Sequence, residues 1–132
     1  MSQQSSAYDV LKSQFGDAIT GSSTFRDQLS VTVAPASIAE VCTFCRDDSR
    51  LSFEMLTDLT AVDFLPREPR FEVVYNLYSF KHNVRLFVKV PLAENETLST
   101  VEGIWKAANW LEREVYDLFG IIFENHSDLR RI

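Results

Sequence analysis

The clearest pattern in the chain is a strict alternation of apolar and polar positions in two runs on either side of residue 82. The apolar positions are Phe71, Val73, Tyr75 and Leu77 in the first run, and Val84, Leu86, Val88 and Val90 in the second. Because side chains alternate between the two faces of a strand, each run predicts a half-buried strand. The short polar turn at residues 81–83 predicts an antiparallel hairpin. Pro91 cannot donate to a ladder, so we expect it to end the second strand.

Two segments in the first half of the chain have helical character instead. A short helix is expected after Ser6, because Ser6 and Asp9 suit a capping box and Gly16 suits the position just past the helix end. A second helix is expected to start at Ser37, with Glu40 as its capping partner. Its apolar positions follow the helical period and are Ile38, Val41, Cys42 and Cys45.

The strongest amphipathic segment lies near the end of the chain. Its apolar positions also recur at helical spacing and are Ile104, Ala107, Ala108, Leu111, Val115 and Leu118. On the opposite side, Arg113 and Asp117 are spaced as an i,i+4 ion pair. Gly120 is suited to end this helix. Trp110 projects away from the apolar stripe, so it is a candidate anchor for a protein interface.

The remaining segments complete the predicted order of elements. Residues 28–34 alternate like a half-buried strand, residues 51–64 contain a strand in their second half, and residues 92–100 form a polar loop. Together these patterns predict an α+β fold of two layers, with a largely antiparallel or mixed sheet and helices packed on one face. The length of 132 residues fits one domain spanning residues 1–132, with no second domain.

Composition and charge exclude several classes of function. The net charge of -6 argues against a nucleic-acid partner, because phosphate binding requires a basic surface. No segment approaches the roughly 18 consecutive apolar residues of a membrane span, so no direct membrane insertion is expected. The polar start at residues 1–6 does not resemble a secretory signal. Two cysteines do not make a disulfide framework, which favours a reducing, cytosolic compartment.

The cysteines form a C-x-x-C motif, which is found in redox dithiols and zinc sites. However, Cys42 and Cys45 fall in the middle and the last turn of the predicted helix, on its apolar stripe, where a cysteine behaves as a small hydrophobe. A zinc ion would need two further ligands, and His82 and His126 have no zinc-finger spacing. We therefore expect both thiols to be unpaired and buried in the core, although a thiol oxidoreductase remains an alternative.

The polar residues of the last helix offer no evident catalytic group. Glu112 and Glu114 flank the apolar stripe but diverge by about 200° around the helix, so a shared proton is not expected and ion pairing along the helix edge is favoured. His126, Ser127 and Asp128 are adjacent in sequence, which does not suit a catalytic triad. No glycine-rich phosphate loop and no ligand set for a metal is present. We predict no catalytic, cofactor-binding or metal-binding residues.

The end of the chain carries a long and specific motif. Residues 112–114 read Glu-Arg-Glu, residues 117–121 read Asp-Leu-Phe-Gly-Ile, and His126 is followed by Leu-Arg-Arg-Ile at residues 129–132. This run resembles the signature of the 30-kilodalton subunit, also called the C subunit, of NADH:quinone oxidoreductase (respiratory complex I). The segment Leu-Thr-Ala-Val-Asp at residues 59–63 is also similar to a family segment that precedes the hairpin.

The resemblance implies a cofactor-free accessory subunit, not an enzyme by itself, in the peripheral arm on the cytoplasmic side of the membrane. Family members dock against the large D subunit, which helps to form the quinone site, while NADH, flavin, iron–sulfur clusters and quinone are expected in partner subunits. The signature residues expected at the interface with the partner are Trp110, Glu112, Arg113, Glu114, Asp117, Phe119, Gly120, His126, Asp128, Arg130 and Arg131. An alternative is the equivalent subunit of a membrane-bound hydrogenase or another complex I-related dehydrogenase.

Two features depart from the family pattern. Ser127 stands where the family usually has proline, and the chain stops at Ile132, where relatives commonly continue with a tail along the partner. The rigidity that proline would give this turn is therefore not predicted here, and we expect the family tail to be absent.

Overall fold

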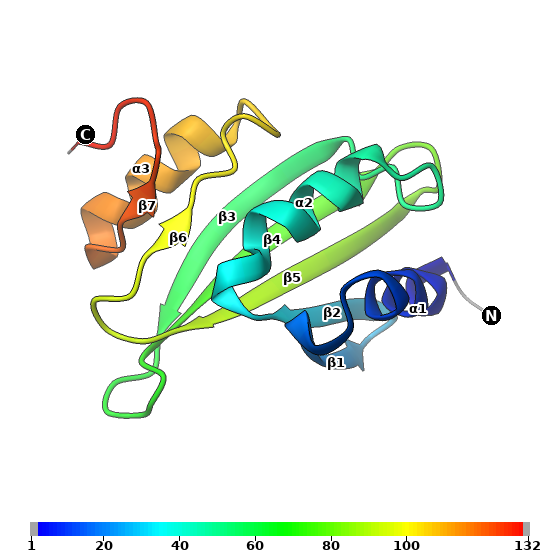
Figure 1. The fold of residues 1–132 in the computed structure, drawn as a ribbon, viewed down its shortest axis with the longest axis horizontal. Helices are drawn as coiled ribbons and strands as arrows, with labels where there is room; N and C mark the ends of the chain where they lie inside the picture. The colour runs from blue at the N-terminus through cyan, green and yellow to red at the C-terminus, as the bar shows by residue number, and fades with distance from the viewer. Residues whose placement is uncertain (1–2, 131–132) are drawn as a thin grey trace.

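The computed structural model describes residues 3–130 and places the elements in the order shown in Figure 1. The longer elements are α1 (Gln3–Phe15), β1 (Ile19–Phe25), β2 (Gln28–Val33), α2 (Ile38–Asp47), β3 (Met55–Asp63), β4 (Phe71–Ser79), β5 (Val84–Leu92) and α3 (Ala108–Phe119). The short elements are the 3-10 turns η1 (Gly16–Ala18) and η2 (Pro35–Ser37) and the strands β6 (Leu98–Ser99) and β7 (Phe123–Glu124).

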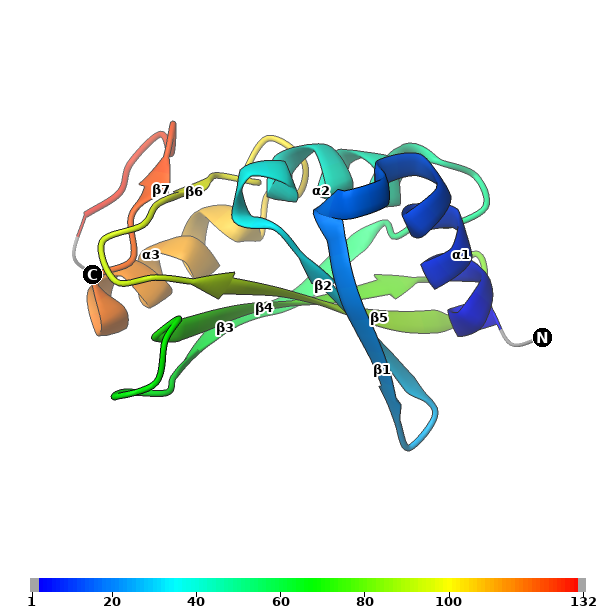
Figure 2. The same cartoon turned by 60° about the horizontal axis from the view of Figure 1, so that its bottom comes forward.

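The described strands β1 to β5 form one five-stranded sheet in the order β1-β2-β5-β4-β3. The pairing of β2 with β5 is parallel, and the other neighbours are antiparallel. Figure 2 shows the helices on one side of this sheet, with the β1–β2 hairpin dipping away on the other side. The predicted α+β fold, with a mixed sheet covered by helices on one face, is confirmed.

The β4–β5 hairpin occupies the middle of the sheet, as the alternating pattern predicts. Val73 lies opposite Val90 and Tyr75 opposite Val88, and all four side chains are buried in the core beneath the helices. The expectation that Pro91 ends β5 was wrong, because the strand continues to Leu92. The pairing of β2 with β5 stops at Lys89, so Pro91 lies where β5 has a free edge and its missing N–H is tolerated.

Several element ends differ from the sequence prediction. The helix α1 already begins at Gln3, so Ser6 and Asp9 lie inside it and not at its start. Ser37 precedes α2, but its side chain makes no capping hydrogen bond, because the turn η2 leads into the helix. Gly16 does follow α1, with the positive φ of 56° that glycine permits.

The strand β1 was not predicted, because its sequence, Ile-Thr-Gly-Ser-Ser-Thr-Phe, is mostly polar and only Ile19 is buried. The strand forms because its backbone pairs with β2 in an antiparallel hydrogen-bond ladder, although the side chains of β1 do not indicate a strand. The two-residue turn Arg26-Asp27 has positive φ at both positions, 52° and 65°, as a type I′ hairpin turn requires. The predicted polar loop at residues 92–100 is also interrupted by β6, which pairs in parallel with β7.

Candidate functional site

The helix α3 has a buried face that contains a carboxylate. Its buried residues are Ala108, Glu112 and Val115, which share one side at helical spacing. Two members of the predicted apolar stripe, Ala107 and Leu118, are exposed instead, and Leu118 is 75% exposed. The helix is therefore rotated about its axis relative to the sequence prediction, so that Glu112 points inward.

The Glu112 carboxylate is fully buried and accepts two hydrogen bonds from the segment that follows β6. The hydroxyl of Thr100 donates to Oε1, and the backbone N–H of Val101 donates to Oε2 at 2.9 Å. The expectation that Glu112 forms ion pairs along the helix edge was wrong. Its donors come from an irregular segment 11 residues or more away along the chain. Neither the helix propensity of the residues nor the spacing of the apolar positions indicates such a contact.

The imidazole of His126 is completely enclosed beside Glu112. Its Nε2 lies 3.0 Å from the carbonyl oxygen of Asn109, and the backbone N–H of Asp128 donates to Nδ1 at 2.9 Å. Because Nδ1 accepts a hydrogen bond, this geometry fits a neutral ring with its proton on Nε2. Nε2 is also 3.9 Å from both Glu112 Oε1 and Glu102 Oε2.

Glu102 ties the segment that contains His126 to α3. Its carboxylate accepts hydrogen bonds from the backbone N–H of Ser127, from the Ser127 hydroxyl at 3.0 Å and from the Asn109 side-chain amide at 2.9 Å. Proline at position 127 could not donate the first of these bonds, because it has no N–H. Ser127 therefore makes a contact that proline in its place could not make.

Burial affects these two carboxylates differently. Burial raises the pKa of Glu112 to about 7, although the hydrogen bonds from Thr100 and Val101 act in the opposite direction. Burial also acts to raise the pKa of Glu102, but the hydrogen bonds from Ser127 and Asn109 outweigh it and keep that pKa below its usual range. Near neutral pH, Glu102 is thus ionised, whereas Glu112 is only partly ionised.

Backbone hydrogen bonds hold the chain after α3 in place. The N–H of Leu98 donates to the carbonyl of Ile122 at 3.1 Å, and the N–H of Thr100 donates to the carbonyl of Glu124 at 2.9 Å. Gly120 ends α3 in the left-handed conformation, with φ of 74°, and its N–H donates to Tyr116, which confirms its predicted role. The buried polar cluster and this short ladder together fix residues 120–128 against the helix.

The outer face of α3 consists of the exposed Trp110 and Leu118 and the half-buried Glu114 and Asp117, and it contains a shallow hollow of about 210 Å³. Trp110 is 50% exposed, in agreement with its predicted outward position. The predicted Arg113–Asp117 ion pair does not occur among the described residues. The Arg113 guanidinium lies instead over the Trp110 ring, 5.5 Å from its centre.

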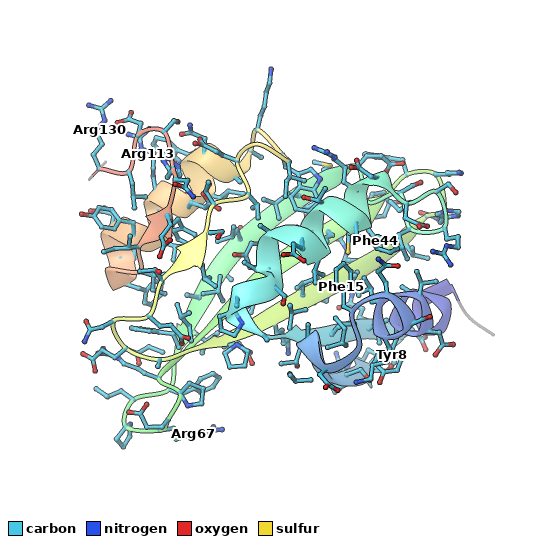
Figure 3. The ribbon with its side chains drawn as sticks, in the orientation of Figure 1. Tyr8, Phe15, Phe44, Arg67, Arg113 and Arg130 are labelled. Carbon is cyan, nitrogen blue, oxygen red and sulfur yellow. The ribbon has the colours of Figure 1, made fainter. Side chains whose placement is uncertain are left out.

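The other predicted interface residues lie at the same end of the molecule. Figure 3 shows Arg113 on α3 and Arg130 on the segment that follows it. Arg130 pairs with Asp128 at the surface, at 3.1 Å. Phe119 packs edge-on against Phe71 with 6.2 Å between the ring centres. Arg131 lies outside the described residues. The sequence prediction thus combined two groups of residues, because Glu112 and His126 are enclosed while Trp110, Glu114 and Arg130 face outward.

The two cysteines are unpaired and fully buried, as predicted. Burial raises the pKa of the Cys45 thiol to about 12, and burial also raises that of Cys42 well above its usual range. A thiol oxidoreductase requires an accessible thiolate, so this placement argues against that alternative. Within residues 3–130, no cluster of three potential metal ligands is found. In the same residues, no helix is long and apolar enough to cross a bilayer.

Comparison with known proteins assigns the family. The family described as "Respiratory-chain NADH dehydrogenase, 30 Kd subunit" matches residues 31–132, and the chain belongs to this family. It is 47% identical to the C subunit of the NADH-quinone oxidoreductase of Geotalea uraniireducens, with 100% of this chain and 80% of that protein covered. It is 49% identical to the C subunit of the same enzyme from Roseiflexus sp. (strain RS-1), with 92% of this chain and 71% of that protein covered. The resemblance seen in the sequence is confirmed.

Solved structures share the fold. A trypsin-resistant fragment (1-134) of Nqo5 matches 96% of this chain and 99% of its own, with a TM-score of 0.76 and 31% identity. A chain of the membrane-bound sulfane sulfur reductase, an archaeal respiratory membrane complex, matches 93% of this chain and 71% of its own, with a TM-score of 0.77. Its identity of 24% limits that likeness to the fold.

Proposed function

We propose that this chain is a cofactor-free accessory subunit of the peripheral arm of an NADH:quinone oxidoreductase, on the cytoplasmic side of the membrane. In this proposal it docks against the large D subunit that helps to form the quinone site, and it supports assembly and electron transfer from NADH to quinone. Partner subunits bind NADH, flavin, iron–sulfur clusters and quinone. Relatives named as subunits of this oxidoreductase support the proposal.

The observation that carries the docking role is the outer face of α3. Trp110 and Leu118 expose large apolar surfaces about two helical turns apart, and Glu114 and Asp117 place carboxylates around them. An apolar patch with a polar rim is typical of a protein interface, and tryptophan is a frequent anchor of binding energy. Burial of Glu112 and His126 behind this helix holds its backbone in place before a partner binds, which lowers the entropy cost of association.

The test is assembly in cells that lack the native subunit. A tagged chain carrying Trp110→Ala and Leu118→Ala should fold normally but recover at least about tenfold less of the large partner subunit. Phe80→Ala is the matched control, because Phe80 is 65% exposed and lies in the turn between β4 and β5, remote from α3. Normal recovery with the double variant would exclude the outer face of α3 as the docking surface.

The same purification distinguishes the two candidate complexes. Recovery with flavin-containing and quinone-site subunits would support an NADH:quinone oxidoreductase, whereas recovery with nickel–iron subunits would support a hydrogenase-type complex. The fold does not decide between respiratory complexes, since it is shared with a chain of the sulfane sulfur reductase. The purified chain should be free of metal and should neither oxidise NADH nor reduce quinone. Turnover by the isolated chain would overturn the accessory role.

A further inference from the structure

A second hollow, of about 300 Å³, lies at the C-terminal end of α3. Its walls are Arg70 and Phe71 at the start of β4, residues 93–97 of the loop after β5, and residues 119–122 at the end of the helix. None of its residues before Phe119 belongs to the sequence motif of the family resemblance. The hollow therefore extends the surface of the predicted interface residues Phe119 and Gly120 to residues that the sequence did not indicate.

The hollow combines aromatic walls with an open rim. Phe71 and Phe119 meet edge to face, with their rings inclined at 75°, and Ile122 is 49% exposed. Leu118 and Phe119 are neighbours on the last turn of α3, and they line the outer-face hollow and this hollow respectively. A partner that covers the outer face of α3 would therefore also reach the second hollow.

The charge in this hollow is negative. The Arg70 guanidinium is engaged, because it pairs with Asp63 at 2.8 Å and with Glu94 at 3.2 Å. Glu96 adds a further carboxylate, whose Oε1 accepts a hydrogen bond from the N–H of Ala93. The C-terminal end of α3 contributes the negative partial charge of its last carbonyl groups. In the lining of the hollow, one cation thus faces two carboxylates and a helix C-terminus, and Asp63 beside Arg70 adds a third carboxylate.

We propose that this hollow receives an arginine side chain of the partner subunit, with its guanidinium against the Phe119 ring and paired with Glu94 and Glu96. This inference rests on the proposed docking function. A planar guanidinium stacks on aromatic rings and pairs with carboxylates, whereas a lysine ammonium is a strongly hydrated point charge. Arg70 already shows this combination at the wall, since it lies 4.7 Å from the centre of the Phe71 ring while it pairs with Asp63.

The first test removes the negative charges at the rim of the hollow, which are those of Glu94 and Glu96. A tagged chain with Glu94→Gln and Glu96→Gln is expressed in cells without the native subunit. Compared with the unsubstituted tagged chain, it should release the partner subunit at a lower salt concentration and should recover about tenfold less of it at moderate salt. Asp17→Asn with Glu40→Gln is the matched control, because both are exposed carboxylates on η1 and α2. Urea unfolding should show that both double variants remain folded. Recovery and salt dependence equal to the control would overturn the proposal.

The second test identifies the occupant. A photoreactive benzoyl-phenylalanine at position 122, activated in the intact complex, should attach to a partner peptide that contains an arginine, which mass spectrometry would identify. Replacing that arginine with lysine should lower partner recovery as much as the Glu94→Gln/Glu96→Gln variant does. Attachment to an apolar peptide without arginine, to a longer tail of this chain or to no partner would overturn the proposal.

The two proposals fail differently. If Trp110→Ala with Leu118→Ala disrupts assembly while the rim variant assembles normally, docking through α3 stands and the arginine site is excluded. If neither variant affects assembly, docking at this end of the molecule is excluded altogether.

Discussion

The imidazole Nε2 of His126 lies 3.9 Å from a carboxylate oxygen of Glu112, and both side chains are completely enclosed. This distance would suit an ion pair, but the hydrogen bonds of His126 fit a neutral ring, and the pKa of Glu112 is raised to about 7. Two enclosed charges are costly unless their geometry compensates for lost hydration, so a largely uncharged pair is the cheaper state. The contact holds the segment after α3 in place and makes stability depend on pH.

Replacing Glu112 with glutamine should remove this pH dependence. The pKa of Glu112 is higher in the folded chain than in the unfolded chain, so its stabilising contribution is complete below about pH 4.5 and is lost as the pH rises through 7. The free energy of unfolding of the wild type, relative to Glu112→Gln, should fall by about 3 kcal/mol between pH 4.5 and 8. Urea titrations at several pH values measure this difference, with Glu114→Gln as the control. A difference in free energy of unfolding that does not change with pH would contradict the raised pKa of Glu112.

Replacing Ser127 with proline should destabilise this chain. Ser127→Pro removes the backbone N–H and the hydroxyl that donate to Glu102, and should cost roughly 1–3 kcal/mol. Ser127→Ala keeps the N–H and should cost about 1 kcal/mol or less. Chemical denaturation of both variants checks this order. A proline variant as stable as the wild type would show that the Glu102 contacts contribute little.

The rotation of α3 predicts a contrast between two aliphatic residues on that helix. Val115 is buried, so Val115→Ala should lower the free energy of unfolding by about 2 kcal/mol through lost burial and a small cavity. Leu118→Ala should change it by less than about 0.5 kcal/mol, because the side chain is 75% exposed. Thermal or urea unfolding distinguishes the two. A large loss for Leu118→Ala would instead support the apolar stripe predicted from sequence.

The cysteines should be inert in the folded protein. Both thiols are fully buried and burial raises the pKa of each, so a thiol reagent should react slowly with native protein and fully after denaturation. Cys42→Ser should cost roughly 1–3 kcal/mol, because the hydroxyl is more costly to bury than the thiol. Ellman titration with and without denaturant is the measurement. Rapid native labelling would mean that α2 opens easily.

The sequence by itself determined the elements whose pattern is local. Alternation fixed the β4–β5 hairpin and its buried face, helical spacing placed Cys42 and Cys45 in the core, and Gly120 marked the end of α3. The motif at the end of the chain identified the family. These features depend on residues a few positions apart, or on a motif read directly.

The tertiary structure alone decided the features that depend on distant partners. The polar strand β1 forms because β2 supplies its ladder, and Glu112 turns inward because Thr100 and Val101 bring donors to it. That inward turn exposes Leu118, which hydrophobicity alone had placed in the core. A buried carboxylate is tolerated only where hydrogen-bond donors meet it. Such donors are positioned by the folded chain as a whole, so the local periodicity of the sequence does not reveal them.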